Sequence, residues 1–234
     1  MKRSQATLAA EMTPDEHELL LGLLRAEPFE ERYLEIGTAA GGTLCRMLTC
    51  LPPDRGFVVV DRMRYFEGQR EAFASNLAQA GVDEGRVELR VAASVAAWKV
   101  ATRRGERFDF MLIDAGHKLL DVTRDLRWTR LLRPGGIVCL HDYDDRWSHR
   151  GVRLAVDRFT RRYPEYERIG RAGTLVALRK RQAPATPEVS ARDIGHALAL
   201  WLPLRVQRTA GKWRKRMRRR RSARSTKKWP TKRS

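Results

Sequence analysis

Residues 32–44 read Arg32-Tyr33-Leu34-Glu35-Ile36-Gly37-Thr38-Ala39-Ala40-Gly41-Gly42-Thr43-Leu44, an apolar strand joined to a helix by a glycine-rich loop. Gly37 and Gly41 allow tight turning and close approach of a ligand, and the amides that open the next helix can meet polar ligand groups. Glu35 adds a carboxylate at the end of the strand. The stretch therefore predicts a nucleotide-sized site. Its ExGxxxG spacing departs from the GxGxxG of dinucleotide-binding folds, so NAD is disfavoured.

Three further apolar runs end, like the first, beside acidic residues. The run 57–60 leads to Asp61, the run 108–113 leads to Asp114, and the run 136–140 leads to His141 and Asp142. The carboxyl ends of parallel strands meet at one edge of an open α/β sheet, and ligands of such folds bind there. We therefore expect these side chains to line one site, with Asp61 placed to accept hydrogen bonds from ribose hydroxyls.

Apolar periodicity predicts alternating strands and helices, which is typical of a parallel sheet with helices on both faces and gives an α/β fold class. Only Arg171 and Ala172 separate the last two strands, and a two-residue link forces a hairpin, so the final strand must run antiparallel. We predict strands at 32–37, 57–61, 86–91, 108–114, 136–141, 166–170 and 173–180, and helices at 42–50, 64–80, 94–103, 119–130 and 150–162.

The N-terminal segment, 1–31, is predicted to hold one helix. Thr13-Pro14-Asp15-Glu16 forms a capping box with proline in the first helical position, so the helix should run from Pro14 to about Ala26.

Length and composition limit the classes of protein to consider. The 234 residues suit one domain of ordinary size, without room for an appended catalytic domain. The absence of a signal peptide or membrane span in the sequence favours a cytoplasmic protein, and abundant Arg and Ala indicate a bacterial source. Cys45, Cys50 and Cys139 form no CxxC or Cys/His cluster, so we expect them in the core rather than in disulfides or a zinc site.

The net charge of +19 is concentrated at the C-terminus. Residues 205–234 hold 15 Lys or Arg and no acid, which leaves 32 basic and 28 acidic residues, or +4, for the rest of the chain. Like-charge repulsion predicts that 205–234 is disordered in isolation. Residues 181–204 are interpreted as a linker followed by an apolar segment too short to span a bilayer.

The ordered set of motifs resembles the class I S-adenosylmethionine (SAM) dependent methyltransferases. It is most similar to the small-molecule O-methyltransferases of the catechol type and to the bacterial cephalosporin-hydroxylase-like group. The resemblance spans the predicted methyltransferase domain, 32–180. It implies SAM as cofactor and a Rossmann-like, doubly wound sheet of seven strands, mostly parallel with an antiparallel C-terminal hairpin strand. In this family a helix before the first strand often helps to cover the cofactor. The alternative for the predicted helix at 14–26 is that it packs on the domain without contacting a ligand.

The resemblance assigns the cofactor site to the glycine loop and to three strand ends. Glu35 with Gly37, Thr38, Gly41 and Gly42 is implied for the methionine end of SAM, and Asp61 for its ribose. Ser94 is implied beside the adenine, although many relatives carry an acid where this chain has Ala93, and Asp114 completes the set.

The resemblance to the catechol-type enzymes also implies a divalent metal ion. A bound ion lowers the pKa of a coordinated hydroxyl and so favours its deprotonation. Asp114 and Asp142 are the implied ligands, with His141 as a further one. Imidazole is a softer ligand than carboxylate, so Mn²⁺ stands beside Mg²⁺ as the candidate ion. The alternative is a purely structural role, in which His141 and Asp142 only form hydrogen bonds with the following loop.

His117 takes the place of the family's lysine base. Histidine titrates near neutral pH and suits removal of a proton from a substrate hydroxyl, so His117 is the predicted catalytic base, with Lys118 a poorer candidate. The alternative for His117 is local capping of a helix.

Two other polar groups lie close to these candidates in the sequence. Asp121 and Asp125 are expected to be exposed partners of Arg124 and Arg127 rather than paired catalytic carboxylates. The loop that contains Asp144, Asp145, Trp147 and His149 is expected at the mouth of the substrate site.

These residues predict a metal-assisted, SAM-dependent O-methyltransferase that acts on a hydroxyl of a small molecule, such as a sugar or a natural-product intermediate. One alternative is an RNA-binding methyltransferase whose basic tail binds nucleic acid. Another places 194–234 on an anionic membrane surface, peripheral to the membrane, with a lipid-linked substrate. The sequence leaves open the acceptor and the oligomeric state, a homo-oligomer included.

Overall fold

The computed structural model describes residues 12–27, 29–146 and 149–200. In this part of the chain, a 7-stranded sheet has the order β3-β2-β1-β4-β5-β7-β6. The strands are β1 Arg32–Ile36, β2 Phe57–Asp61, β3 Val87–Val91, β4 Phe108–Ile113, β5 Leu132–Leu140, β6 Tyr166–Ala172 and β7 Leu175–Lys180. The helices are α1 Pro14–Ala26, α2 Gly42–Cys50, α3 Gln69–Gln79, α4 Ser94–Arg103, α5 Leu119–Asp125, α6 Arg150–Arg162 and α7 Ala191–Ala199, with 3₁₀ turns η1 Glu84–Arg86 and η2 Leu126–Leu131.

The sheet is doubly wound, which confirms the predicted fold class. Strands β1 to β5 pair in parallel, and β7 lies between β5 and β6 and is antiparallel to both. The strand order reverses between β1 and β4, and such a reversal opens the crevice in which ligands of these folds bind.

The C-terminal hairpin turns two residues later than predicted. Arg171 and Ala172 belong to β6 and pair with β7, and the link is Gly173-Thr174. Gly173 has φ +50, a left-handed conformation that glycine adopts without a steric penalty from Cβ. The predicted antiparallel direction of the final strand is confirmed, but its boundary was wrong by two residues because glycine, not the preceding pair, makes the turn.

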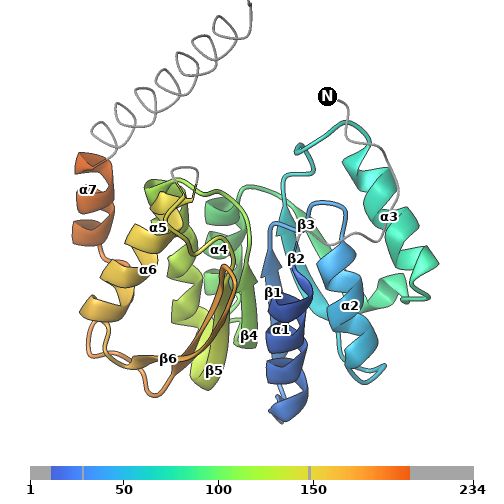
Figure 1. Ribbon diagram of the computed structural model, residues 1–234, viewed down its shortest axis with the longest axis horizontal. Helices are drawn as coiled ribbons and strands as arrows, with labels where there is room; N and C mark the ends of the chain where they lie inside the picture. Colours follow the sequence, from blue (N-terminus) through green and yellow to red (C-terminus); the bar gives the residue numbers. More distant parts are fainter. Residues whose placement is uncertain (1–11, 28, 147–148, 201–234) are drawn as a thin grey trace, which may run out of the picture.

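Different helices cover the two faces of the sheet, because successive side chains of a strand point to opposite faces. Leu34 and Ile36 of β1 pack with α4, α5 and α6, whereas Tyr33 packs with α1, α2 and α3. Figure 1 shows α2 and α3 on one side of the sheet and α5, α6 and α7 on the other. The buried thiols of Cys45 and Cys139 lie in the core beneath α1 to α3.

Three element boundaries differ from the predicted ones for local reasons. The helix predicted at 64–80 begins only at Gln69, because Gly68 before it has φ +73 and turns the chain into the helix. The helix predicted at 119–130 is α-helical only to Asp125 and continues as η2. The strand predicted from 136 begins at Leu132, which pairs with Phe108 ahead of a shift in register.

Residues 188–199 pack against the sheet domain and extend it beyond Lys180. The Lys180 Nζ lies 2.8 Å from Glu188 Oε1, and the Tyr166 hydroxyl donates to the same oxygen at 2.6 Å. Val189 is buried, and α7 begins with a capping box at Ser190. The C-terminal segment therefore docks through a buried ion pair as well as apolar contact.

Several sequence predictions fall on residues outside the described ranges. These are Trp147 of the substrate loop, the end of the apolar segment, 201–204, and the whole basic tail, 205–234. Among the helices that the structure describes, none has the length and apolar character needed to cross a membrane.

Candidate active site

The register of the central strands brings the predicted site residues to one edge. Ile36, Ile113 and Leu140 are neighbours in the ladder at the ends of β1, β4 and β5. The ladder continues one step further, since Asp114 N donates to Ile36 O at 2.9 Å and His141 N donates to Ile113 O at 3.1 Å. Parallel pairing in register therefore places the first residues after these strands side by side.

The glycine loop after β1 is shaped by two glycines with positive φ. Gly37 has φ +84, and a Cβ built there would lie 2.2 Å from the backbone oxygen of Asp114. Gly41 has φ +81 and precedes α2, and a Cβ there would lie 2.8 Å from the ring of Phe73. Ala39 between them also has positive φ. Both glycines are required because the loop presses against neighbouring elements, as a cradle for a ligand does.

Asp61 joins this loop to the end of β2. Its carboxylate accepts hydrogen bonds from Thr38 N at 3.0 Å, Met63 N at 2.6 Å and Gln69 Nε2 at 3.3 Å. The Gln69 amide also donates to Ala39 O at 2.9 Å. Gln69, buried at the start of α3, belongs to the candidate site by these contacts and was not predicted from the sequence; its only sequence signal was its place after Gly68.

Glu35 is a buried acid with an orphaned oxygen. The residue is 2% exposed, and its Oε2 has no hydrogen-bond partner in the described part of the chain. Burial, together with the charges of Asp114 and Asp61, raises the pKa of Glu35 to about 8. A cation bound nearby would restore the ionised form, so a buried acid beside a glycine cradle fits the positively charged methionine end of SAM.

Five side chains form what we term the edge cluster: Asp114, His117, His141, Asp142 and His149. His117 Nε2 lies 2.7 Å from Asp142 Oδ2, and His149 Nδ1 lies 3.0 Å from Asp142 Oδ1. His141 Nδ1 lies 3.2 Å from Asp114 Oδ1 and 3.9 Å from Asp142 Oδ1. Asp142 therefore contacts His117 through one oxygen and faces His141 and His149 through the other.

His141 is held between two carboxylates. Its Nδ1 faces Asp114, and its Nε2 lies 3.5 Å from Glu16 Oε2 of α1. Burial opposes a charge on the ring, but the hydrogen bond and charge of Asp114, with the charges of Asp142 and Glu16, raise the pKa of His141 to about 9. The contact with Glu16 joins the N-terminal helix to the site.

The edge cluster fits a divalent metal ion. One ligand atom from each of Asp114, His141 and Asp142 lies within 4.8 Å of the others, and the same holds for His117, Asp142 and His149. The first set is the one predicted from the sequence. His149 was expected only at the substrate mouth. Mixed nitrogen and carboxylate donors suit Mn²⁺ and other transition ions as well as Mg²⁺.

Ser94 at the start of α4 and Asp125 at the end of α5 lie together. Ser94 Oγ accepts a hydrogen bond from Trp128 Nε1 at 2.9 Å, so the hydroxyl predicted for adenine is engaged by the core. The expectation that Asp125 is exposed is wrong, since the residue is 5% exposed. Its burial raises the pKa of Asp125 to about 7, against the hydrogen bond from Ser94.

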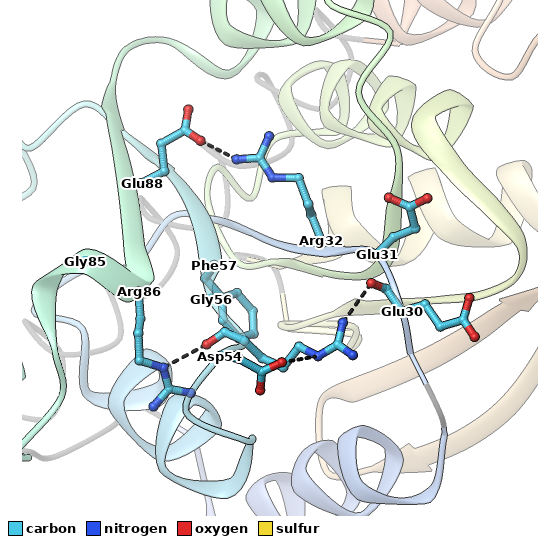
Figure 2. Close-up of a pocket in the computed structure, with 10 residues that line it drawn as sticks. Glu30, Glu31, Arg32, Asp54, Gly56, Phe57, Gly85, Arg86 and Glu88 are labelled. Atoms are coloured by element: carbon cyan, nitrogen blue, oxygen red, sulfur yellow. Dashed lines mark hydrogen bonds and ion pairs between the residues drawn. The ribbon is translucent and has the colours of Figure 1, made fainter.

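A hollow lies at the opposite edge of the sheet (Figure 2). It measures about 380 Å³, whereas the space beside the edge cluster is only about 10 Å³. The hollow is lined by Arg32 and Phe57, which begin β1 and β2, and by Arg86. Arg32 pairs with Glu88, and Arg86 Nε donates to Arg55 O at 2.7 Å. The hollow lies at the amino ends of the strands, whereas ligands of these folds bind at the carboxyl ends, so it is not the candidate active site.

Comparison with known proteins agrees with this geometry. Residues 34–143 match the family model of a methyltransferase domain. The O-methyltransferase TomG from Streptomyces achromogenes, involved in tomaymycin synthesis and solved with SAM, is 27% identical, with a TM-score of 0.58 over 74% of this chain and 82% of that chain. An O-methyltransferase from Bacillus cereus, solved with S-adenosylhomocysteine (SAH), is 20% identical, with a TM-score of 0.59 over 74% of this chain and 84% of that chain. Among curated proteins, none matches.

The sheet order, the glycine loop and the methyltransferase domain matched over residues 34–143 show that the protein is a SAM-dependent methyltransferase. Within this class, its resemblance to the small-molecule O-methyltransferase group is confirmed.

Proposed function

We propose that the protein transfers the methyl group of SAM to a hydroxyl of a small molecule, with His117 as base and a divalent ion at the edge cluster. The observation that carries the proposal is the bridging position of Asp142. One carboxylate oxygen contacts His117 at 2.7 Å, and the other faces His141 at 3.9 Å. A hydroxyl held at the edge cluster would therefore lie close to a base.

The cofactor would be held by residues that the structure gathers at the strand ends. The loop amides from Gly37 to Gly42 and the buried Glu35 suit the methionine end, and Asp61 suits the ribose because its carboxylate lies at the end of β2 beside the loop. Asp114 lies against Gly37, so it would complete the wall between the methyl donor and the acceptor.

His117 is suited to accept the proton of the acceptor hydroxyl. When Nε2–H donates to Asp142, the other ring nitrogen, Nδ1, carries the lone pair that can take a proton. The hydrogen bond with Asp142 raises the pKa of His117 above its ordinary value. In the reaction the hydroxyl oxygen bonds to the methyl carbon, the sulfonium bond breaks to leave SAH, and the proton passes to His117.

Asp114, Asp142 and His141 would hold the divalent ion. When bound, such an ion lowers the pKa of a coordinated hydroxyl and fixes its position. Asp142 would help to hold the ion, and its contact with His117 would orient the base toward a hydroxyl bound at the edge cluster. The nitrogen donor of His141 makes Mn²⁺ a stronger candidate than in an all-oxygen site.

The acceptor class is a natural-product intermediate or a sugar hydroxyl. Support comes from TomG, at 27% identity, whose name refers to tomaymycin synthesis. The proposed location is cytoplasmic, in line with the sequence prediction.

Calorimetric titration with SAM and NAD, followed by an acceptor screen with Mg²⁺, Mn²⁺ or chelator, tests the proposal. We expect binding of SAM but not NAD, and methylation of a hydroxylated acceptor that chelator abolishes and Mn²⁺ restores. Methylation of RNA alone, or of nitrogen acceptors alone, would overturn the proposed acceptor class. Undiminished turnover after chelation would show that the reaction needs no divalent ion.

A further inference from the structure

Glu16 of the N-terminal helix reaches the edge cluster from outside the methyltransferase motif. We propose that Glu16 is a positioning residue that orients His141 for metal binding. The inference rests on the metal ion of the proposed function. It concerns a helix that precedes the matched domain, residues 34–143, and a carboxylate that the sequence predicts only as part of a capping box.

The contacts of Glu16 go beyond those of a helix cap. Oε2 accepts a hydrogen bond from Thr13 N at 2.7 Å, as a capping box requires. Oε1 accepts from both the amide and the hydroxyl of Thr174, at 2.7 and 2.8 Å. A capping glutamate needs only the first of these contacts and ordinarily stays in solvent, whereas Glu16 is 2% exposed.

The β6–β7 turn is adapted to this carboxylate. A Cβ built at Gly173 would lie 2.6 Å from Glu16 Oε1, so only glycine lets the turn approach so closely. With Oε1 fixed by Thr174, the second oxygen is directed at His141 Nε2, 3.5 Å away. Three elements, α1, the hairpin and β5, therefore fix the direction of one carboxylate oxygen.

A histidine that ligates a metal through one nitrogen ordinarily donates its other N–H to a carboxylate or carbonyl, which fixes the tautomer and the ring orientation. In His141, Nδ1 is the nitrogen that faces Asp114 and Asp142. The proton must then reside on Nε2, where Glu16 is the carboxylate that faces it. Glu16 thereby presents the lone pair of Nδ1 to the ion.

Direct Mn²⁺ binding to the full chain, measured by calorimetry and by the loss of the free-ion EPR signal without SAM or acceptor, tests this role. Removal of an outer carboxylate typically lowers metal affinity about 10–100-fold, and we expect that loss for Glu16→Gln. Glu18→Gln is the matched control: it makes the same substitution at an exposed position of the same helix, so it should keep wild-type affinity. Glu16→Asp keeps the charge but shortens the reach and should give an intermediate loss.

Thermal unfolding of each variant separates folding from binding. Wild-type Mn²⁺ affinity in folded Glu16→Gln, or an equal loss in Glu18→Gln, would overturn the positioning role while leaving the metal in place. If Glu16→Gln does not fold, unchanged affinity in Glu16→Asp would overturn it equally. If the wild-type chain binds no Mn²⁺ but still methylates its acceptor, the proposed metal site and the positioning role of Glu16 are both wrong. The proposed methyl transfer is then still supported.

Discussion

His117 Nε2 lies 2.7 Å from Asp142 Oδ2, although the two residues follow different strands, β4 and β5. Asp142 reaches this position with φ +62, a left-handed conformation that is uncommon outside glycine. The pair has the form of a base with an orienting carboxylate: when Nε2–H donates to Asp142, the other ring nitrogen, Nδ1, can accept a proton.

Replacement of the proposed base, His117, should slow the chemical step without weakening cofactor binding. A positioned general base contributes about 10²–10⁴-fold, so His117→Ala should lower kcat by that factor and leave the Kd for SAM unchanged. Lys118→Ala, at the exposed neighbouring position, is the control and should keep wild-type kcat. Equal loss in both variants would indicate damage to the loop rather than loss of a base.

The same base should set the pH dependence. The base acts in its neutral form, and Asp142 raises the pKa of His117 above its ordinary value of about 6.5, so kcat/KM should rise with pH through a value above that. A pH profile of kcat/KM measures this limb, which His117→Ala should lose. A limb that persists in the variant would assign the ionisation to another group.

Glu35 should make the cofactor-free protein less stable as the pH rises. Its folded pKa of about 8 lies above the unfolded value, so between roughly pH 4.5 and 8 only the folded chain holds the proton, and stability falls across that window. Between pH 5 and 7 the loss should be about 2–3 kcal/mol. Glu35→Gln, which does not ionise, should flatten the curve from denaturant unfolding at each pH, and bind SAM on the order of tenfold more weakly.

If the free energy of unfolding of the wild-type protein does not change from pH 5 to 7, the raised pKa of Glu35 is contradicted. Unchanged SAM affinity in Glu35→Gln would instead show that Glu35 does not contribute to cofactor binding, even though it is buried.

Gly37 should tolerate no side chain. In Gly37→Ala, the new Cβ would lie 2.2 Å from the Asp114 backbone oxygen, on top of the strain of φ +84. Gly105 has φ +65 but nothing within 4 Å, so Gly105→Ala isolates the cost of positive φ, about 1–2 kcal/mol. Gly37→Ala should lose about 4 kcal/mol or more and all measurable SAM binding. Equal urea midpoints for the two variants would show that the contact with Asp114 relaxes freely.

The ligand type at position 141 should control the choice of metal. His141→Asn replaces a ring nitrogen with an amide oxygen and adds no charge beside Glu16, so the preference for Mn²⁺ over Mg²⁺ should fall. The measurement is the ratio of the two metal dissociation constants, with Asp145→Asn, an exposed acid outside the edge cluster, as control. An unchanged ratio would exclude His141 as a ligand.

The packing of residues 188–199 on the sheet domain should depend on both partners of the buried ion pair between Lys180 and Glu188. The side chains of Lys180 and Glu188 are 4% and 5% exposed. Glu188→Ala leaves a buried charge unpaired and should cost about 3–5 kcal/mol, whereas the double variant Lys180→Met/Glu188→Leu should recover most of that. Denaturant unfolding measures both, and a double variant no better than the single one would contradict the account.

Much of the site could be predicted because its residues carry local signals. Gly37, Asp61, Asp114 and Asp142 each stand at the end of an apolar run, and parallel strands in register bring such ends together. The placement of Ser94 in a hydrogen bond with Trp128 had no such signal, because the indole comes from a turn 34 residues further along the chain.

The sequence by itself determined the alternation of strands and helices, the glycine loop and the acids at the strand ends, because periodicity and strand-end residues are properties of neighbours along the chain. Only the tertiary structure decided that His149 joins Asp142, that α7 docks on the domain, and that Glu16 bonds Thr174, 158 positions away, while facing His141. These contacts depend on which buried polar group finds a partner once the elements have packed, and that pairing leaves no trace in local pattern.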